Sequence, residues 1–230
     1  MRDRILGILG GMGPYASLEF NKKLFDFCDA KKDWEFIHTI LDSDVTIPSR
    51  TRHLLYGEED PSPYIVRAIG RLQRAGAEAV VLPCNSVHYF YERVVPHIGI
   101  PWLNMLEIVS DEIRNRGGGK ILILGGFVTV TQKVYDPYLP RTLYLDEAGN
   151  ALVYRLIEEL KIGDAEAARK SVATLIGTIE ESDADAVLLA CTELTLSDTL
   201  MSYRGRRLFD SNGIYAQYAV DYMRRGNEKI

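Results

Sequence analysis

The sequence contains little cysteine, and its thiols follow no pattern of a cross-linked or metal-binding framework. Only three cysteines occur among 230 residues, at Cys28, Cys84 and Cys191. An odd number of widely spaced thiols, without a C-x-x-C or H-x-x-x-H motif, argues against a disulfide scaffold and against a zinc site of the usual spacing. We therefore expect reduced thiols, no bound metal and a cytoplasmic location.

Long apolar runs and an excess of positive charge are also absent. No segment approaches the roughly 20 apolar residues that a membrane span requires, and the run at residues 5–9 is too short for the apolar core of a signal peptide. Acidic residues outnumber basic ones by 32 to 27, which gives a net charge of −5 and a pI near 5.5. A general nucleic-acid binder needs clustered Lys and Arg, so we expect neither a nucleic-acid nor a membrane partner.

Short apolar segments that alternate with amphipathic stretches run through the whole chain. The amphipathic stretches predict helices that begin near Pro14 and Pro63 and a helix over residues 164–181. This alternation is typical of βαβ units around a parallel sheet, so we expect an α/β fold. The predicted strands are residues 5–9, 36–41, 79–82, 102–105, 121–124, 143–145, 187–190 and 207–209.

Two segments of the sequence occur twice in similar form. The stretch AEAVVLPCNS at residues 77–86 returns as ADAVLLACTE at residues 184–193. The stretch ILGILGG at residues 5–11 returns as KILILGG at residues 120–126. The chain is therefore expected to contain two similar halves, each built around its own parallel sheet.

The position of the repeats predicts where the halves divide. We expect residues 1–100 plus 208–230 to form the half that carries Cys84. Residues 101–207 would form the half that carries Cys191. A pseudo-two-fold axis would relate the two halves.

Both repeated cysteines stand at the expected carboxyl end of a strand, which is where ligands bind in open parallel sheets. Polar residues that suit the start of a helix follow each one, so free backbone N–H groups are expected beside each thiol. Such a setting lowers the pKa of a thiol, favours the thiolate and attracts a carboxylate. Across the pseudo-two-fold axis, Cys84 and Cys191 would face one small ligand from opposite sides, and one could remove a proton while the other returns one.

Two further residues have simpler interpretations. Cys28 has no counterpart in the other half and lies in a helical stretch, so we expect a small buried hydrophobic residue. His88 follows Asn85 by three residues and stands close enough to line the site, but the expected place for it is the surface of a helix.

The first glycine loop offers an alternative function. The sequence GMGPYA at residues 11–16 fits the G-x-G-x-x-A pattern of a dinucleotide site, and Asp42 follows near the end of the second predicted strand. However, Asp42 stands farther along the chain than the usual roughly 20 residues, and Pro14 removes an amide that a pyrophosphate would use. A glycine-rich anion loop for a smaller ligand therefore fits better.

Three motifs in this order and spacing resemble those of the aspartate/glutamate racemase family, and within it the aspartate racemases. They are GILGGMGP at residues 7–14, PCNSVH at residues 83–88 and CTE at residues 191–193. The resemblance covers nearly the whole chain. It implies two flavodoxin-like α/β domains with the active site in the cleft between them, and a racemase that needs neither pyridoxal phosphate nor any other cofactor.

The resemblance also implies roles for individual residues. Cys191 would deprotonate the L-enantiomer of the amino acid and Cys84 the D-enantiomer. A homodimer, which is the commonest oligomer, is expected. The substrate contacts carried over by the resemblance are Met12, Arg50, Asn85, Ser86, Val87, Thr129, Lys161 and Thr192.

Departures from the family pattern leave the substrate open. The sequence GGFV at residues 125–128 replaces a threonine-rich run, and Asp44 is expected to bring a negative charge close to Arg50. Aspartate, glutamate or a related amino acid is the expected substrate. The alternatives are another small carboxylate or a hydantoin on the same scaffold, and an amino-acid-binding protein without catalytic turnover.

Overall fold

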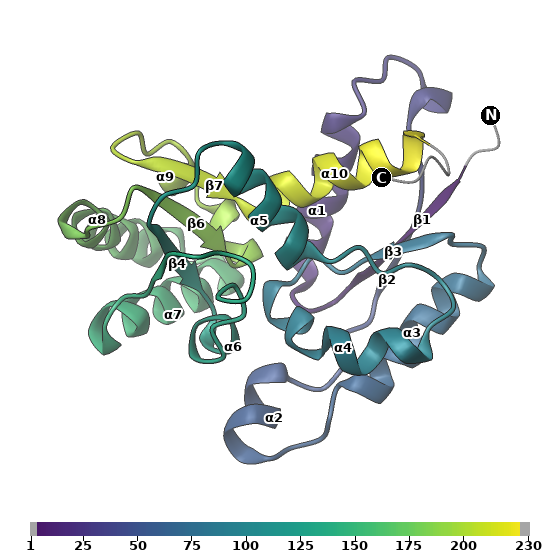
Figure 1. Ribbon diagram of the computed structural model, residues 1–230, viewed down its shortest axis with the longest axis horizontal. Coiled ribbons are helices and arrows are strands. Elements are labelled where there is room, and N and C mark those ends of the chain that lie inside the picture. The colour runs from purple at the N-terminus through teal and green to yellow at the C-terminus, as the bar shows by residue number, and fades with distance from the viewer. Residues whose placement is uncertain (1–3, 226–230) are drawn as a thin grey trace.

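The chain folds into two parallel β-sheets with helices around them (Figure 1). The computed structural model describes residues 4–225. The strand order is β2-β1-β3 in the first sheet and β5-β4-β6-β7 in the second, so the expected α/β class with two parallel sheets is confirmed. The strands are β1 (Ile5–Gly10), β2 (His38–Ser43), β3 (Ala79–Val81), β4 (Ile121–Gly125), β5 (Thr142–Leu143), β6 (Ala186–Ala190) and β7 (Arg207–Asp210).

Helices connect the strands and cover the sheets. Pro14 begins the first helix as expected, and the side chain of Asp164 caps the eighth by accepting the N–H of Ala167. None of the helices described is long and apolar enough to cross a membrane. The α-helices are α1 (Pro14–Phe27), α2 (Arg50–Tyr56), α3 (Ser62–Arg74), α4 (Tyr91–Val94), α5 (Met105–Asn115), α6 (Phe127–Thr131), α7 (Glu147–Ile162), α8 (Ala165–Glu181), α9 (Asp198–Met201) and α10 (Ser211–Arg225). The short 3-10 helices are η1 (Asp33–Glu35), η2 (Asn85–Phe90), η3 (Val95–His97) and η4 (Thr192–Leu196).

The duplication in the sequence is preserved in the register of the central strands. Leu6 of β1 pairs with Ala79 of β3, and the corresponding Ile121 of β4 pairs with Ala186 of β6. All residues of β4 and β6 are buried, as are those of β1 after Ile5. Strands that are covered on both faces consist of continuous apolar residues, which explains why these runs could be recognised.

One predicted strand is wrong, and the expected division at residues 100 and 208 does not follow the strand pairing. Residues 102–105 form no strand: Trp102 makes an isolated bridge to Val80 of β3, and Met105 begins α5. This bridge lies on the first sheet, whereas β7 pairs with β6 in the second. The reason is topological, because the short connection through η4 and α9 returns the chain beside β6 rather than to the first sheet.

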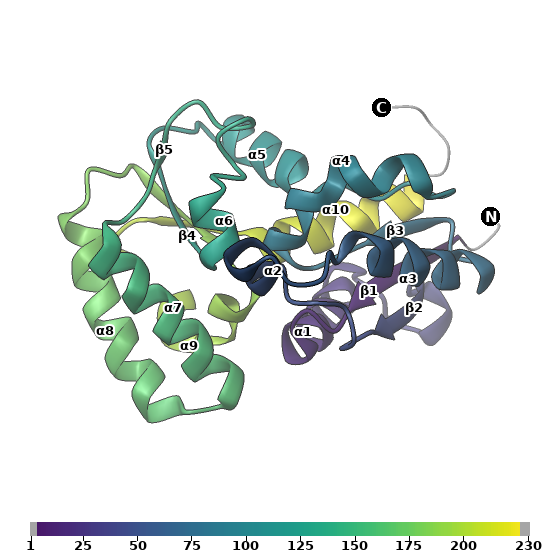
Figure 2. The ribbon, with the colours of Figure 1, turned by 90° about the horizontal axis from the view of Figure 1, so that it is seen from below.

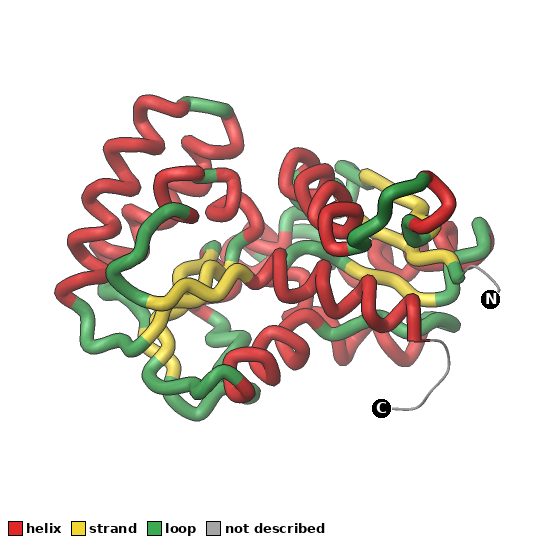
Figure 3. The backbone as a smooth tube through the Cα atoms, turned by 90° about the horizontal axis from the view of Figure 1, so that it is seen from above, coloured by secondary structure: helices red, strands yellow, loops and turns green. Residues whose placement is uncertain are grey.

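A shared core joins the two sheets. One hydrophobic cluster contains Leu6 and Ile8 of β1 together with Ile121 and Ile123 of β4, and Tyr215 of α10 lies fully buried in it. Helix α10 packs against α1 and α5 and spans the space between the sheets (Figure 2). The strands accordingly form two separate groups with helices between and around them (Figure 3).

The glycine loop after β1 provides a test of how backbone conformation limits the sequence. Gly11 has φ +87°, and a Cβ there would overlap the main chain of Asp44, whereas Gly57 has φ +66° and open space around it. We expect Gly57→Ala to lower the free energy of unfolding by about 1–2 kcal/mol, because only the left-handed conformation is strained. Gly11→Ala should lower the free energy of unfolding more than Gly57→Ala does, because its Cβ also overlaps the main chain of Asp44. Urea unfolding measures both losses. Equal losses in the two variants would contradict this reading of the loop.

Candidate active site

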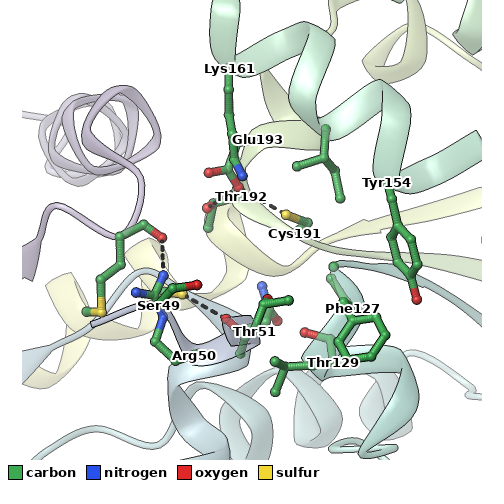
Figure 4. A pocket seen from close by; sticks show the side chains of 18 of the residues that line it. Ser49, Arg50, Thr51, Phe127, Thr129, Tyr154, Lys161, Cys191, Thr192 and Glu193 are labelled. Atoms are coloured by element: carbon green, nitrogen blue, oxygen red, sulfur yellow. Dashed lines mark hydrogen bonds between the residues drawn. The ribbon is translucent and has the colours of Figure 1, made fainter. Parts of the chain in front are cut away.

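A cavity of about 370 Å³ lies where the carboxyl ends of strands from both sheets meet (Figure 4). Segments that follow β1, β3, β4 and β6 contribute to it, and α2 and α7 complete its walls. This is the position expected for a ligand site in parallel sheets. The cavity is lined by Met12, Ser49, Arg50, Thr51, Cys84, Asn85, Ser86, Gly126, Phe127, Val128, Thr129, Tyr154, Ile157, Glu158, Lys161, Ala190, Cys191, Thr192 and Glu193.

The cavity brings together nearly all the residues expected from the sequence, and Val87 is the exception. Val87 is fully buried in the hydrophobic cluster that also contains Leu82 and Phe90. The tight turn of η2 directs this side chain into the core, so it is not among the lining residues. The residues that do line the cavity as expected are Cys84, Cys191, Met12, Arg50, Asn85, Ser86, Thr129, Lys161 and Thr192.

The two cysteines occupy equivalent positions in the two halves. Cys84 has extended backbone angles (φ −157°, ψ 111°) and is followed at once by η2. Cys191 has similar angles (φ −143°, ψ 128°) and is followed at once by η4. The repeated sequence motif therefore adopts a repeated backbone geometry at the strand ends.

The side chain of Asn85 links the first strand end to the second half of the molecule. The hydroxyl of Tyr135 donates a hydrogen bond of 2.5 Å to Asn85 Oδ1, and Asn85 Nδ2 donates to Ser211 Oγ at 3.2 Å. Ser211 in turn donates to the carbonyl of Leu189 in β6 at 2.7 Å. All these groups are buried, so the amide of Asn85 positions the turn rather than standing free for a ligand.

The residue two positions after each cysteine contacts the thiol. Ser86 Oγ lies 3.3 Å from Cys84 Sγ, whereas Cys191 Sγ donates a hydrogen bond of 3.0 Å to the carboxylate of Glu193. Thr192 Oγ1 donates to the same carboxylate oxygen at 3.2 Å. The equivalent positions therefore present a hydroxyl to one thiol and a carboxylate to the other.

The expectation of an acidified thiol is wrong for Cys191. Burial of the thiol, followed by the charge of Glu193 and the hydrogen bond to it, raises the pKa of Cys191 well above its usual value. Cys84 is close enough to contribute to the same effect. Because these influences outweigh the backbone N–H groups of η4, Cys191 is held as a neutral thiol.

Two cationic side chains reach the cavity. The guanidinium of Arg50 donates to the carbonyls of Pro48 and Met12 at 3.3 and 3.4 Å, and its Nε is buried without a hydrogen-bond partner among the described residues. Lys161 Nζ, near the end of α7, lies 2.7 Å from Glu158 Oε1. Although burial opposes its charge, the hydrogen bond to Glu158 and the neighbouring negative charges raise the pKa of Lys161 above its usual value.

Asp44 does not act on Arg50 as the sequence predicted. Its carboxylate lies 2.5 Å from Arg71 and accepts hydrogen bonds from Thr46, and together these contacts lower the pKa of Asp44 despite its partial burial. Asp42 is bound by the same guanidinium at 2.8 Å. Both carboxylates therefore belong to an ion-pair cluster with Arg71. Asp42 is engaged by this cluster, so nothing supports the ribose contact that it would make in a dinucleotide site.

His88 is buried in the structure rather than exposed on a helix. The N–H of Met105, at the start of α5, donates to His88 Nε2 at 3.1 Å, so the proton of the neutral ring is on Nδ1. Nδ1 therefore donates to the carbonyl of Cys84 at 2.9 Å. Burial lowers the pKa of His88 to about 4, which keeps this bridge between Cys84 and α5 uncharged.

Sequence reasoning missed Glu193 and Tyr154 as site residues. Both had a recognisable signal. Glu193 follows its cysteine by the same two positions as Ser86, which the repeat pairs with it. Tyr154 precedes Lys161 on α7 by seven residues, a spacing that places both on one face of a helix.

A comparison with known protein families covers most of the chain. The family model described as Asp/Glu/hydantoin racemase matches residues 9–219. The chain belongs to this family. The resemblance inferred from the sequence is confirmed, and because racemases are isomerases, the chain is an isomerase of this family.

Individual relatives of this racemase agree with the assignment. The broad specificity amino-acid racemase RacX of Bacillus subtilis (strain 168) is 26% identical over 198 residues, which are 83% of this chain and 86% of RacX. The structure of the aspartate racemase of Picrophilus torridus superposes with a TM-score of 0.82 at 27% identity and covers 95% of this chain and 94% of that one. The glutamate racemase of Thermus thermophilus, solved in complex with β-chloro-D-alanine, shares the fold with a TM-score of 0.67 at 20% identity, covering 97% and 81%.

The buried neutral His88 predicts an acid-sensitive stability. Between pH 6.5 and 4 the unfolded chain binds a proton at this histidine and the folded chain does not, so folding stability decreases as the pH falls through this range. Relative to His88→Gln, the wild type should lose up to about 3 kcal/mol of unfolding free energy over that window. Urea unfolding of both proteins at several pH values measures the difference, and parallel pH dependences would contradict it.

The Glu193 carboxylate predicts the reactivity of the neighbouring thiol. Removing its charge in Glu193→Gln should lower the pKa of Cys191 and speed its alkylation by iodoacetamide at pH 7.5, by roughly tenfold for each pKa unit. Mass spectrometry of the modified peptide follows the rate as a function of pH. Glu166→Gln removes a carboxylate that is paired with Lys170 on the outer helix α8, away from the cavity, and should leave the rate within about twofold. An unchanged pH profile in Glu193→Gln would refute the assigned contact.

Proposed function

We propose that the chain is a cofactor-independent racemase of aspartate, glutamate or a related amino acid, with Cys84 and Cys191 as its two acid–base groups. The observation that carries this proposal is that both thiols stand at equivalent strand ends and line the same cavity. Thiols that approach an α-carbon from two sides can exchange its proton for one on the opposite face, which inverts the configuration.

The contacts of the thiols support different starting roles for them. Cys191 donates its S–H to Glu193, so we assign Cys191 the role of the acid. Cys84 Sγ has the hydroxyl of Ser86 at 3.3 Å in place of a carboxylate, so we assign Cys84 the role of the base. In this scheme Cys84 would act first on the enantiomer whose α-hydrogen faces it, which the family resemblance assigns as the D-enantiomer.

The proton balance of one turnover follows from these roles. The Cys84 thiolate takes the α-hydrogen as a proton, and the electron pair left on the α-carbon is delocalised into the carboxylate. Cys191 then gives its proton to the opposite face, so the reaction leaves Cys84 as a thiol and Cys191 as a thiolate. The next turnover in the reverse direction restores the starting state, and the guanidinium of Arg50 is the lining cation best suited to hold a carboxylate.

The two-base mechanism predicts a loss of activity in either single cysteine variant. Cys84→Ala and Cys191→Ala should each reduce racemisation in both directions by roughly 10²–10⁴-fold, the contribution typical of a positioned acid or base. Circular dichroism of the amino acid follows racemisation, and ¹H NMR in D₂O follows exchange at the α-carbon.

Cys28 provides a matched control for these variants. It is buried in the shared core and does not line the cavity, so Cys28→Ala should keep wild-type turnover once folding has been verified. A Cys84→Ala or Cys191→Ala protein that racemises at the wild-type rate would overturn the two-base proposal.

A further inference from the structure

One wall of the cavity is aromatic and apolar. Phe127, the first residue of α6, and Tyr154 of α7 have ring centroids 6.1 Å apart at 58°. The buried side chains of Val128 and Ile157 extend the same lining. Figure 4 shows these two rings on one side of Cys191, with Arg50 on the other.

The acidic residues that line the cavity lie near Lys161 and leave Arg50 without a carboxylate partner. Lys161 already has Glu158 at 2.7 Å, and the buried Glu193 adds a second negative charge to its surroundings. Arg50 has no carboxylate partner among the described ion pairs, and its guanidinium donates only to main-chain carbonyls. The cavity therefore offers one uncompensated cation, which suits a ligand with a single carboxylate.

We propose that this racemase acts on α-amino acids with a large uncharged side chain, apolar or aromatic, which packs on Phe127 and Tyr154 while Arg50 binds the α-carboxylate. The inference rests on the proposed racemase function and changes its substrate from an acidic to an uncharged amino acid. It departs from the aspartate, glutamate or related substrate expected from the sequence, and it assigns a role to the GGFV segment, in which Phe127 stands where the family has a threonine-rich run.

The physical basis is that the Phe127–Tyr154 surface favours an apolar side chain, whereas neither this surface nor Lys161 favours a second carboxylate. An apolar side chain gains free energy when it leaves water for the Phe127–Tyr154 surface. A carboxylate on the same surface loses most of its hydration and can receive a side-chain hydrogen bond there only from the Tyr154 hydroxyl, and it can reach Lys161 only in competition with Glu158. An acidic side chain is thus disfavoured at both places, although the pair with Glu158 is partly exposed and weak.

The test measures α-proton exchange in D₂O by ¹H NMR for phenylalanine, tyrosine, leucine, aspartate and glutamate with the wild-type protein. We expect kcat/KM for phenylalanine or leucine to exceed that for aspartate by at least about tenfold, the discrimination typical of an apolar pocket. Phe127→Ala should reduce kcat/KM for phenylalanine by about 10–100-fold and leave aspartate nearly unchanged. Phe127→Leu keeps an apolar wall and should retain most of the preference.

A pair of matched variants tests the charge argument. Glu158→Gln frees Lys161 and should raise kcat/KM for aspartate several-fold, about what the loss of one exposed ion pair allows, with no gain for phenylalanine. Glu166→Gln removes the equivalent partner of Lys170 on the outer helix α8, where Nζ and Oε1 are also 2.7 Å apart. Because that pair lies outside the cavity, the substrate ratio should not change.

The outcomes separate the substrate inference from the racemase proposal. If aspartate exchanges at least as fast as phenylalanine and Phe127→Ala affects both equally, the substrate inference is overturned while the racemase function stands. If no amino acid exchanges, calorimetric titration with the same panel decides between ligands. If phenylalanine then binds more tightly than aspartate, the inferred ligand class stands and the racemase proposal is overturned. If aspartate binds more tightly, both proposals are overturned.

Discussion

The hydrogen bonds of Asn85 fix how the two halves of the site meet. Tyr135 and Ser211 bind its amide from segments that follow β4 and β7, and Ser211 also holds the carbonyl of Leu189 in β6. Because the groups are buried, losing one partner would leave an unpaired polar atom. These hydrogen bonds thus connect the turn that carries Cys84 directly to the sheet that carries Cys191. The shared hydrophobic core packs beneath them and restricts movement between the two.

The duplication places the two thiols at equivalent positions, but the side chains that contact them differ. Taking a proton from one face and returning one to the other requires one thiolate and one thiol at the start of each turnover. The hydroxyl of Ser86 and the carboxylate of Glu193 occupy equivalent places but act oppositely on a neighbouring negative charge. In the proposed two-base reaction, the residues two positions after each cysteine would therefore decide which thiol starts as the acid.

The sequence could predict what local pattern determines and failed where packing decides. Buried parallel strands are continuous apolar runs, so most strands and both thiol positions were found. Trp102 formed only an isolated bridge because Met105 already begins α5, whose cap at Asn104 requires the preceding turn. The burial of His88 and the partner of Asp44 depend on contacts with α5 and α3, which no local pattern reports.

The first glycine loop shows why a motif needs its surroundings. Its glycines match a phosphate-binding pattern, yet a Cβ at Gly11 would meet the main chain of Asp44, and one at Gly13 would lie 2.6 Å from Glu193 Oε1. These glycines make room for the main chain of Asp44 and for the carboxylate of Glu193. Because the carboxylate that Gly13 accommodates also binds Cys191, the loop of the first half is a steric requirement for the thiol of the second.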